Sequence, residues 1–157
     1  MSLRSSLNEA LKEAMKARDS ARLSTLRLIN AAIKDRDIAA RGEGRAEGRS
    51  EEGVADTELL ALLGKLVKQR QESARIYEEG GRLELAEKEL AEVRVITEFL
   101  PRQMSEEEAA AVIDETIAAL GANSIRDMGR VMAELKAKYT GQMDFAVIGA
   151  KIREKLA

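Results

Sequence analysis

The chain contains no cysteine and no histidine, and Pro101 is its single proline. Without cysteine, disulfide bonds and thiolate chemistry are excluded. Without histidine, the chain lacks the most common general base and the most common zinc ligand. Aromatic residues make up only 3% of the sequence, so any core must consist of aliphatic side chains and methionine. Such a composition, with little proline to interrupt a helix, favours helices over strands.

Long apolar runs are also missing. No stretch of 18 apolar residues is present, which predicts that no helix of the chain spans a membrane. The first six residues lead directly into an amphipathic pattern and lack the apolar segment of a secretory signal. These features predict a cytoplasmic protein.

Apolar residues recur at helical spacing through the first hundred residues and predict a bundle of about four helices. The helices are expected over residues 3–18, 20–40, 57–79 and 82–99. Ser20 and Asp56 stand where N-caps of the second and third helices are expected. Gly80-Gly81 and Pro101 stand where the third and fourth helices end. The expected inward positions include Leu3, Leu7, Leu11 and Met15 in the first helix, Leu59, Leu62, Leu63 and Leu66 in the third, and Leu83, Ala86, Leu90, Val93 and Ile96 in the fourth.

Residues 41–55 interrupt this pattern. They contain four glycines and charges of both signs without an apolar period. Such a segment is typical of a mobile, solvated loop. We expect no β-strand here or elsewhere in the chain.

The C-terminal third predicts a second, smaller domain. Ser105 and Glu108 form a capping box at its start, and Ser124 with Asp127 resembles a second box. Gly121 and Gly141 are expected to end the first two helices, and Asp144 to cap the last. The predicted fold is therefore all-α, with a helical bundle over residues 1–101 followed by a three-helix domain over residues 102–157.

No catalytic motif is present. The sequence contains no phosphate-binding G-x-x-x-x-G-K-[ST], no G-x-G-x-x-G, and neither S-x-x-K nor G-x-S-x-G. Clusters of glutamate, such as Glu106 to Glu108, could hold a hard cation, but solvated helix ends are the more common use of such residues. We therefore predict no catalytic, cofactor-binding or metal-binding residue, no cofactor, and no intrinsic enzymatic activity.

A basic bias marks the end of the chain, where residues 116–157 carry seven basic and four acidic groups. These cations could bind the phosphates of a nucleic acid, or they could simply form a solvated helix face. With so few aromatic residues to stack on bases, contacts should go to the nucleic-acid backbone and show little base specificity. The predicted nucleic-acid-binding residues are Arg126, Arg130, Lys136, Lys138, Lys151 and Lys155.

Three strings of the sequence resemble the GatB/YqeY family. Residues 65–108 contain Lys68-Gln69-Arg70, Gly81-Arg82, Leu85-Ala86, Glu89 and Leu100-Pro101 in the family's order. Residues 124–144 carry a frame typical of the family, namely Gly129, Met132, Lys138, Gly141 and Asp144. Residues 25–34 fit as well. Gln142 departs from the pattern, since relatives often carry Lys or Arg at this position.

The resemblance implies a C-terminal domain similar to the tail of the B subunit of the tRNA-dependent amidotransferase, which engages the outer corner of tRNA. The implied function is a non-catalytic adaptor that binds tRNA, or a tRNA-charging or amidotransferase protein, through its C-terminal domain. Two alternatives are a protein-interaction module without RNA binding and a carbon–nitrogen ligase component that uses glutamine as amido donor. No membrane partner and no DNA specificity are expected.

Overall fold

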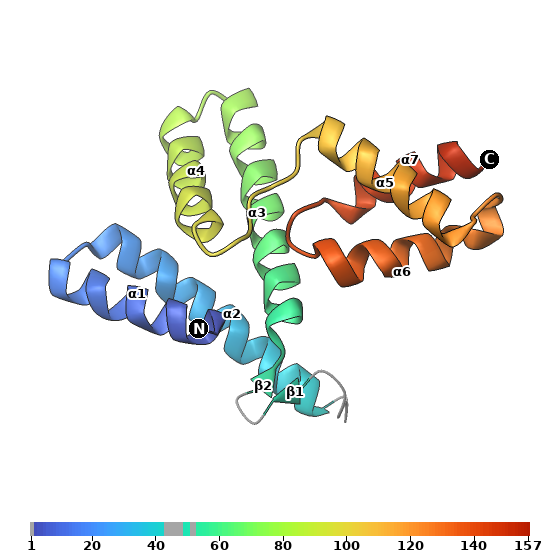
Figure 1. The fold of residues 1–157 in the computed structure, drawn as a ribbon. Helices are drawn as coiled ribbons and strands as arrows, with labels where there is room; N and C mark the ends of the chain where they lie inside the picture. The colour runs from blue at the N-terminus through green and yellow to red at the C-terminus, as the bar shows by residue number, and fades with distance from the viewer. Residues whose placement is uncertain (1, 43–48, 51–52) are drawn as a thin grey trace. The chain divides into compact units, whose positions relative to one another are not determined.

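A computed structural model of the chain describes residues 2–42, 49–50 and 53–157, which fold as two compact units, Met1–Leu100 and Pro101–Ala157 (Figure 1). The first unit consists of α1 (Leu3–Ala17), α2 (Ser20–Gly42), β1 (Arg49–Ser50), β2 (Gly53–Val54), α3 (Asp56–Glu79) and α4 (Leu83–Thr97). The second consists of α5 (Glu106–Leu120), the 3-10 helix η1 (Ile125–Asp127), α6 (Met128–Tyr139) and α7 (Phe145–Leu156). The predicted all-α fold class is confirmed.

The core of the first unit forms where two helical hairpins meet. α4 lies beside the C-terminal half of α3, and the α1–α2 pair packs against this second hairpin (Figure 1). Its fully buried large side chains come from all four helices and from β2: Leu7, Leu26, Ile29, Val54, Leu59, Leu63 and Ile96. The fully buried members of this core are all aliphatic, as the composition predicted, and Phe99 packs against them partly buried.

Two of the expected inward positions differ in the structure. Met15 is 54% exposed, because residues four apart rotate by about 40° at each step and Met15 lies about 120° around α1 from Leu3. Ala10 and Ala14 are buried there instead. Leu83, the first residue of α4, is 67% exposed at the tip of its hairpin.

Two predicted caps are also wrong. Asp19, not Ser20, caps α2, since its carboxylate accepts a hydrogen bond from the Arg22 backbone N at 3.1 Å. Asp56 is the first residue of α3 rather than its cap, and its carboxylate accepts from the Leu3 backbone N at 3.2 Å. Sequence spacing alone did not show which of two neighbouring residues would cap each helix. Asp56 binds the backbone of α1 instead of capping α3.

The expectation that the chain contains no strand is wrong for one short pair. β1 and β2 pair antiparallel, with Arg49 opposite Val54 and Ser50 opposite Gly53. β2 is fixed by tertiary bonds, because the Val54 backbone N donates to Asp37 Oδ1 at 3.0 Å and Arg4 Nη2 donates to the Val54 carbonyl at 3.1 Å. Residues 43–48 and 51–52 of the expected loop lie outside the described residues.

The second unit packs three helices around Ile113, Val131, Leu135 and Ile152. The predicted capping box at its start is confirmed, since the Ser105 hydroxyl accepts from Glu108 N at 3.1 Å while the Glu108 carboxylate accepts from Ser105 N. The predicted box at Ser124 is wrong: the Ser124 side chain makes no capping bond, and η1 forms before α6.

Candidate nucleic-acid interface

The cations of the second unit are positioned by the close packing of α6 against α7. Val131 and Leu135 are buried on α6, and Ile148 and Ile152 are buried on α7. The two helices approach at Gly149, where a Cβ atom would lie 3.6 Å from the methyl carbon of Met128 and 3.9 Å from that of Met132. This contact identifies which edge of each helix faces the other.

One group of cations flanks the α6–α7 contact. Lys136 follows Met132 by one turn and Arg153 follows Gly149 by one turn, so each lies on the edge of its helix that faces the other helix. Arg126 lies in η1, which contacts both α6 and α7. All three side chains are exposed, and none forms an ion pair within the part of the chain that the structure describes. We call Arg126, Lys136 and Arg153 the α6–α7 basic edge.

The lysines of a second group lie toward the other edge of these helices. Lys155 forms an ion pair with Asp114 of α5, and Lys151 lies one turn earlier on the same side of α7. Lys138 lies on the opposite edge of α6 from Lys136 and pairs with Glu134 at 2.8 Å. This ion pair raises the pKa of Lys138, chiefly through its hydrogen bond to Glu134.

Arg130 is also engaged by a carboxylate, that of Asp127 at 2.8 Å. The Asp127 carboxylate accepts from the Asn123 backbone N at 3.1 Å as well. The backbone hydrogen bond from Asn123 and the bond from Arg130 together lower the pKa of Asp127. Asp127 therefore binds the backbone before η1 and partly neutralises the charge of Arg130.

The six predicted residues therefore do not form one patch. Arg130, Lys138 and Lys155 are each paired with a carboxylate, whereas no ion pair forms at Arg126, Lys136 or Lys151 within the described ranges. Arg153 was missed, because the Lys151/Lys155 pair defined the expected face of α7. The signal that could have found Arg153 is its spacing of four residues from Gly149, which lies beside the methyl groups of Met128 and Met132 of α6.

The basic bias is local to α6 and α7. Residues 101–157 carry eight basic and nine acidic groups, and five of the nine, Glu106, Glu107, Glu108, Asp114 and Glu115, belong to α5. An anion would therefore be attracted to one side of this unit and repelled from another.

The aromatic residues of the second unit point inward. Tyr139 and Phe145 are half-buried and pack against the aliphatic core. Met128 and Met132 pack on the same core, so they belong to the interior rather than to an adaptable surface.

The turn that carries the family frame is held by main-chain bonds. Gly141 has a φ of 89°, a conformation that favours glycine, and the carbonyl of Gln142 accepts from the Met104 backbone N at 3.0 Å. Gly129 has no atom within 4 Å of an added Cβ, so close packing does not explain this glycine. The half-buried Gln142 thus contributes its backbone to the fold and brings no cation to the turn.

The longest family string forms the α3–α4 hairpin. Arg70 Nε of α3 donates to the Glu92 carboxylate of α4 at 2.7 Å, and both side chains are largely buried. Gly81 turns the chain with a φ of 74°, and Ala86 is buried where α4 packs on α3. These members of the string therefore stabilise the α3–α4 hairpin.

The described ranges contain no group of three or more acidic residues placed to hold a metal ion. None of the helices in those ranges combines the length and apolar character needed to cross a bilayer.

Two curated relatives share part of the chain. Altered inheritance of mitochondria protein 41 of Clavispora lusitaniae is 37% identical over 98 residues, which cover 62% of this chain and 51% of the relative. The protein of the same name from Lachancea thermotolerans is 31% identical over 94 residues, covering 60% of this chain and 46% of the relative. The chain thus spans about half the length of the curated relatives it matches.

These relatives correct one prediction from the sequence. Both are named as mitochondrial proteins, which contradicts the cytoplasmic location expected from the composition and the N-terminal residues. Composition does not report the compartment, because soluble helical proteins of similar composition occur in several.

A family model described as Yqey-like protein matches residues 4–156. The match extends over both structural units and includes the α3–α4 hairpin, the α6–α7 turn and the strings that suggested the resemblance. The chain belongs to the YqeY-like protein family.

Proposed function

We propose that this protein is a non-catalytic adaptor that binds the phosphate backbone of tRNA through the α6–α7 basic edge. The observation that carries the proposal is the placement of Arg126, Lys136 and Arg153 beside one helix contact, exposed and without carboxylate partners among the described residues. When exposed cations neutralise phosphates, the counterions condensed on the RNA are released. This release favours binding at low salt. The likeness to the amidotransferase tail supports tRNA as the RNA.

The proposed contact is to shape and backbone rather than to bases. The aromatic residues of the second unit face its core, and the acidic side of α5 repels phosphates. The acidic side would therefore orient the RNA on the basic edge. Structured RNA presents phosphates and hydroxyl groups that suit this kind of recognition.

A salt titration tests the proposal. Labelled tRNA is titrated with the full chain at several salt concentrations, and log K should fall against log salt with a slope of about −2 to −3, since three cations meet phosphates. The variant Arg126→Ala/Lys136→Ala/Arg153→Ala should flatten this slope by about 2 to 3, since it removes all three proposed phosphate contacts.

The matched control removes three cations that already have carboxylate partners, in the variant Arg130→Ala/Lys138→Ala/Lys155→Ala. It changes the net charge by the same amount and should flatten the slope less. Equal effects of the two variants, or no binding at low salt, would contradict the proposal. The protein-interaction function would then be favoured, because Ile125 and Val147 are 49% and 50% exposed in this unit.

A further inference from the structure

The outward face of α2 carries a short heptad pattern whose residues do not pack in the core of the described structure. Its members follow one another at alternating spacings of four and three residues: Ser24, Leu28, Ala31, Asp35 and Ile38. This alternation is the a/d spacing of a helix that packs along another helix. All five are exposed, with Leu28 at 46% and Ile38 at 63%. We call these five residues the α2 seam.

The core contacts of α2 lie on its other side. Leu26, Ile29 and Ile33 are buried against the rest of the first unit, and Thr25 is buried beside them. One face of α2 therefore packs in the core of the unit, whereas the seam remains exposed to solvent in the described structure.

Three cations follow the seam at intervals of seven residues. Arg27, Lys34 and Arg41 occupy the position directly before each a position, which in a coiled coil is the g position that pairs with charges on the partner helix. Each side chain is exposed, and none forms an ion pair with a described residue. Arg41 also acts on Asp37 of its own helix, whose pKa it helps to lower.

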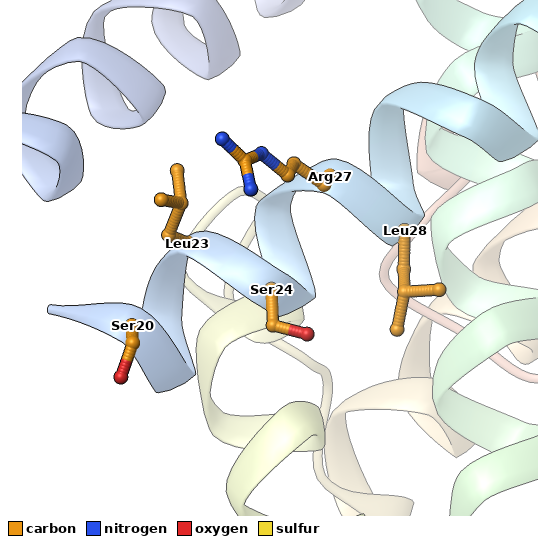
Figure 2. Close-up of a pocket in the computed structure, with 5 residues that line it drawn as sticks. All are labelled: Ser20, Leu23, Ser24, Arg27 and Leu28. Atoms are coloured by element: carbon orange, nitrogen blue, oxygen red, sulfur yellow. The ribbon is translucent and has the colours of Figure 1, made fainter.

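A hollow lies at the N-terminal end of the seam (Figure 2). It has a volume of about 320 Å³ and is lined by Ser20, Leu23, Ser24, Arg27 and Leu28, all from α2. Two of these residues, Ser24 and Leu28, belong to the seam, and Arg27 lies beside them. Figure 2 shows Leu23 and Arg27 projecting to one side of this surface and Leu28 to another.

We propose that the α2 seam docks an amphipathic helix of a partner protein that carries acidic residues at heptad spacing. Its apolar residues would lie against Leu28, Ala31 and Ile38, and its carboxylates would pair with Arg27, Lys34 and Arg41. Asp35 requires a cation or a neutral polar group opposite, which fixes the register of the helix, as buried polar a positions do in coiled coils.

Charge complementarity distinguishes this partner from a second copy of the chain. In an antiparallel pair of α2 helices the three cations would face one another and repel. In a parallel pair they would face the e positions Thr25, Ala32 and Ala39, none of which is acidic. A phosphate surface is also disfavoured, because Asp35 lies in the middle of the seam and would repel it.

The test uses a synthetic helical peptide of about three heptads with leucine at a and d, glutamate at e and g, and one lysine at a central a position. Its binding to the full chain is measured by fluorescence anisotropy beside a peptide with lysine at e and g. The glutamate peptide should bind the wild type and the lysine peptide should not. Arg27→Glu/Lys34→Glu should weaken the first by about tenfold and create binding of the second, since two attractions become repulsions.

Arg41 is left unchanged in this variant because it supports Asp37. The matched control is Lys12→Glu/Lys16→Glu, two exposed cations of α1 with the same change of net charge. It should alter binding by less than about twofold, as expected for charges outside the contact. Circular dichroism checks that both variants remain folded.

Absence of binding by the glutamate peptide, or equal weakening by the two variants, would overturn the proposal. So would concentration-dependent self-association, or binding of anionic lipid vesicles or tRNA, that Arg27→Glu/Lys34→Glu removes. These outcomes are distinguishable from failure of the proposed tRNA contact, because the residues tested there belong to the other unit.

Discussion

At the scale of single residues, Asp37 joins segments that are far apart in the sequence. Its carboxylate accepts hydrogen bonds from both terminal nitrogens of Arg4, at 2.8 and 3.0 Å, and from the Val54 backbone N at 3.0 Å. Gly53 lies so close that a Cβ there would be 2.4 Å from Asp37 Oδ1, and its φ of 126° suits glycine. The hydrogen bond from Arg4 is the main cause that lowers the pKa of Asp37, against the opposing effect of burial.

Replacing Asp37 by Asn should therefore destabilise the first unit by about 1–3 kcal/mol at neutral pH, because the largely buried Arg4 loses a charged partner. The pKa of Asp37 is lower in the folded chain than its ordinary value of 3.8, so its stabilisation is present above that value and is lost as the pH falls through the folded pKa. Urea unfolding at pH 7 and pH 3 measures both effects. A variant as stable as the wild type at pH 7 would show that this cluster contributes nothing.

At the scale of single helices, α3 shows how periodicity separates fully buried from half-buried leucines. Leu59 and Leu63 are fully buried, whereas Leu66 packs on the edge of the same core. The sequence predicted both Leu63 and Leu66 as inward positions, because both continue the same helical spacing of leucines. Only the location of α1, α2 and α4 decides which part of the stripe is enclosed.

We predict that Leu63→Ala costs about 2–5 kcal/mol of unfolding free energy and that Leu66→Ala costs at least about 1 kcal/mol less, since a half-buried position leaves a smaller cavity. Urea denaturation followed by circular dichroism gives both values. If Leu66→Ala were the more damaging, the enclosed part of α3 would have been assigned wrongly.

Ser105 and Ser124 both precede helices of the second unit, and their replacement by alanine should have different effects on stability. Ser105→Ala should cost about 1 kcal/mol, because it removes the hydroxyl that accepts from Glu108 N. Ser124→Ala should cost clearly less, because the Ser124 side chain makes no capping bond. Thermal unfolding of the two variants distinguishes them, and equal losses would mean that the second box forms in solution.

At the scale of the whole molecule, the two compact units present different surfaces. The first presents the α2 seam, and the second combines an acidic α5 with the α6–α7 basic edge. The proposals for these two surfaces are independent, since their variants alter different units.

Independent folding of the units remains a prediction. Residues 1–101 alone should be helical and should unfold in one cooperative thermal transition, because the first core draws its buried side chains from α1 to α4 and β2. Circular dichroism during a temperature scan measures this transition. Gradual melting without a transition would show that the first unit depends on the second.

The sequence by itself determined the helical class and most helix positions. Helical periodicity is a local property, since residues three and four apart share a face whatever the rest of the chain does. The Ser105 box and the cap at Asp144 were predicted for the same reason, because both capping contacts lie within one turn. The absence of cysteine and histidine likewise limits chemistry without reference to any fold.

Only the tertiary structure decided which side chains meet. The Asp56 carboxylate accepts a hydrogen bond from the backbone N of Leu3, and the Asp37 carboxylate accepts one from the Val54 backbone N of β2. Lys155 forms an ion pair with Asp114. The tertiary structure also separated the predicted cations into those paired with a carboxylate and those without a carboxylate partner among the described residues, and it placed Arg153 beside the α6–α7 contact. These outcomes depend on residues distant in sequence, whose approach is set by packing of the whole core and leaves no periodic signal in the chain.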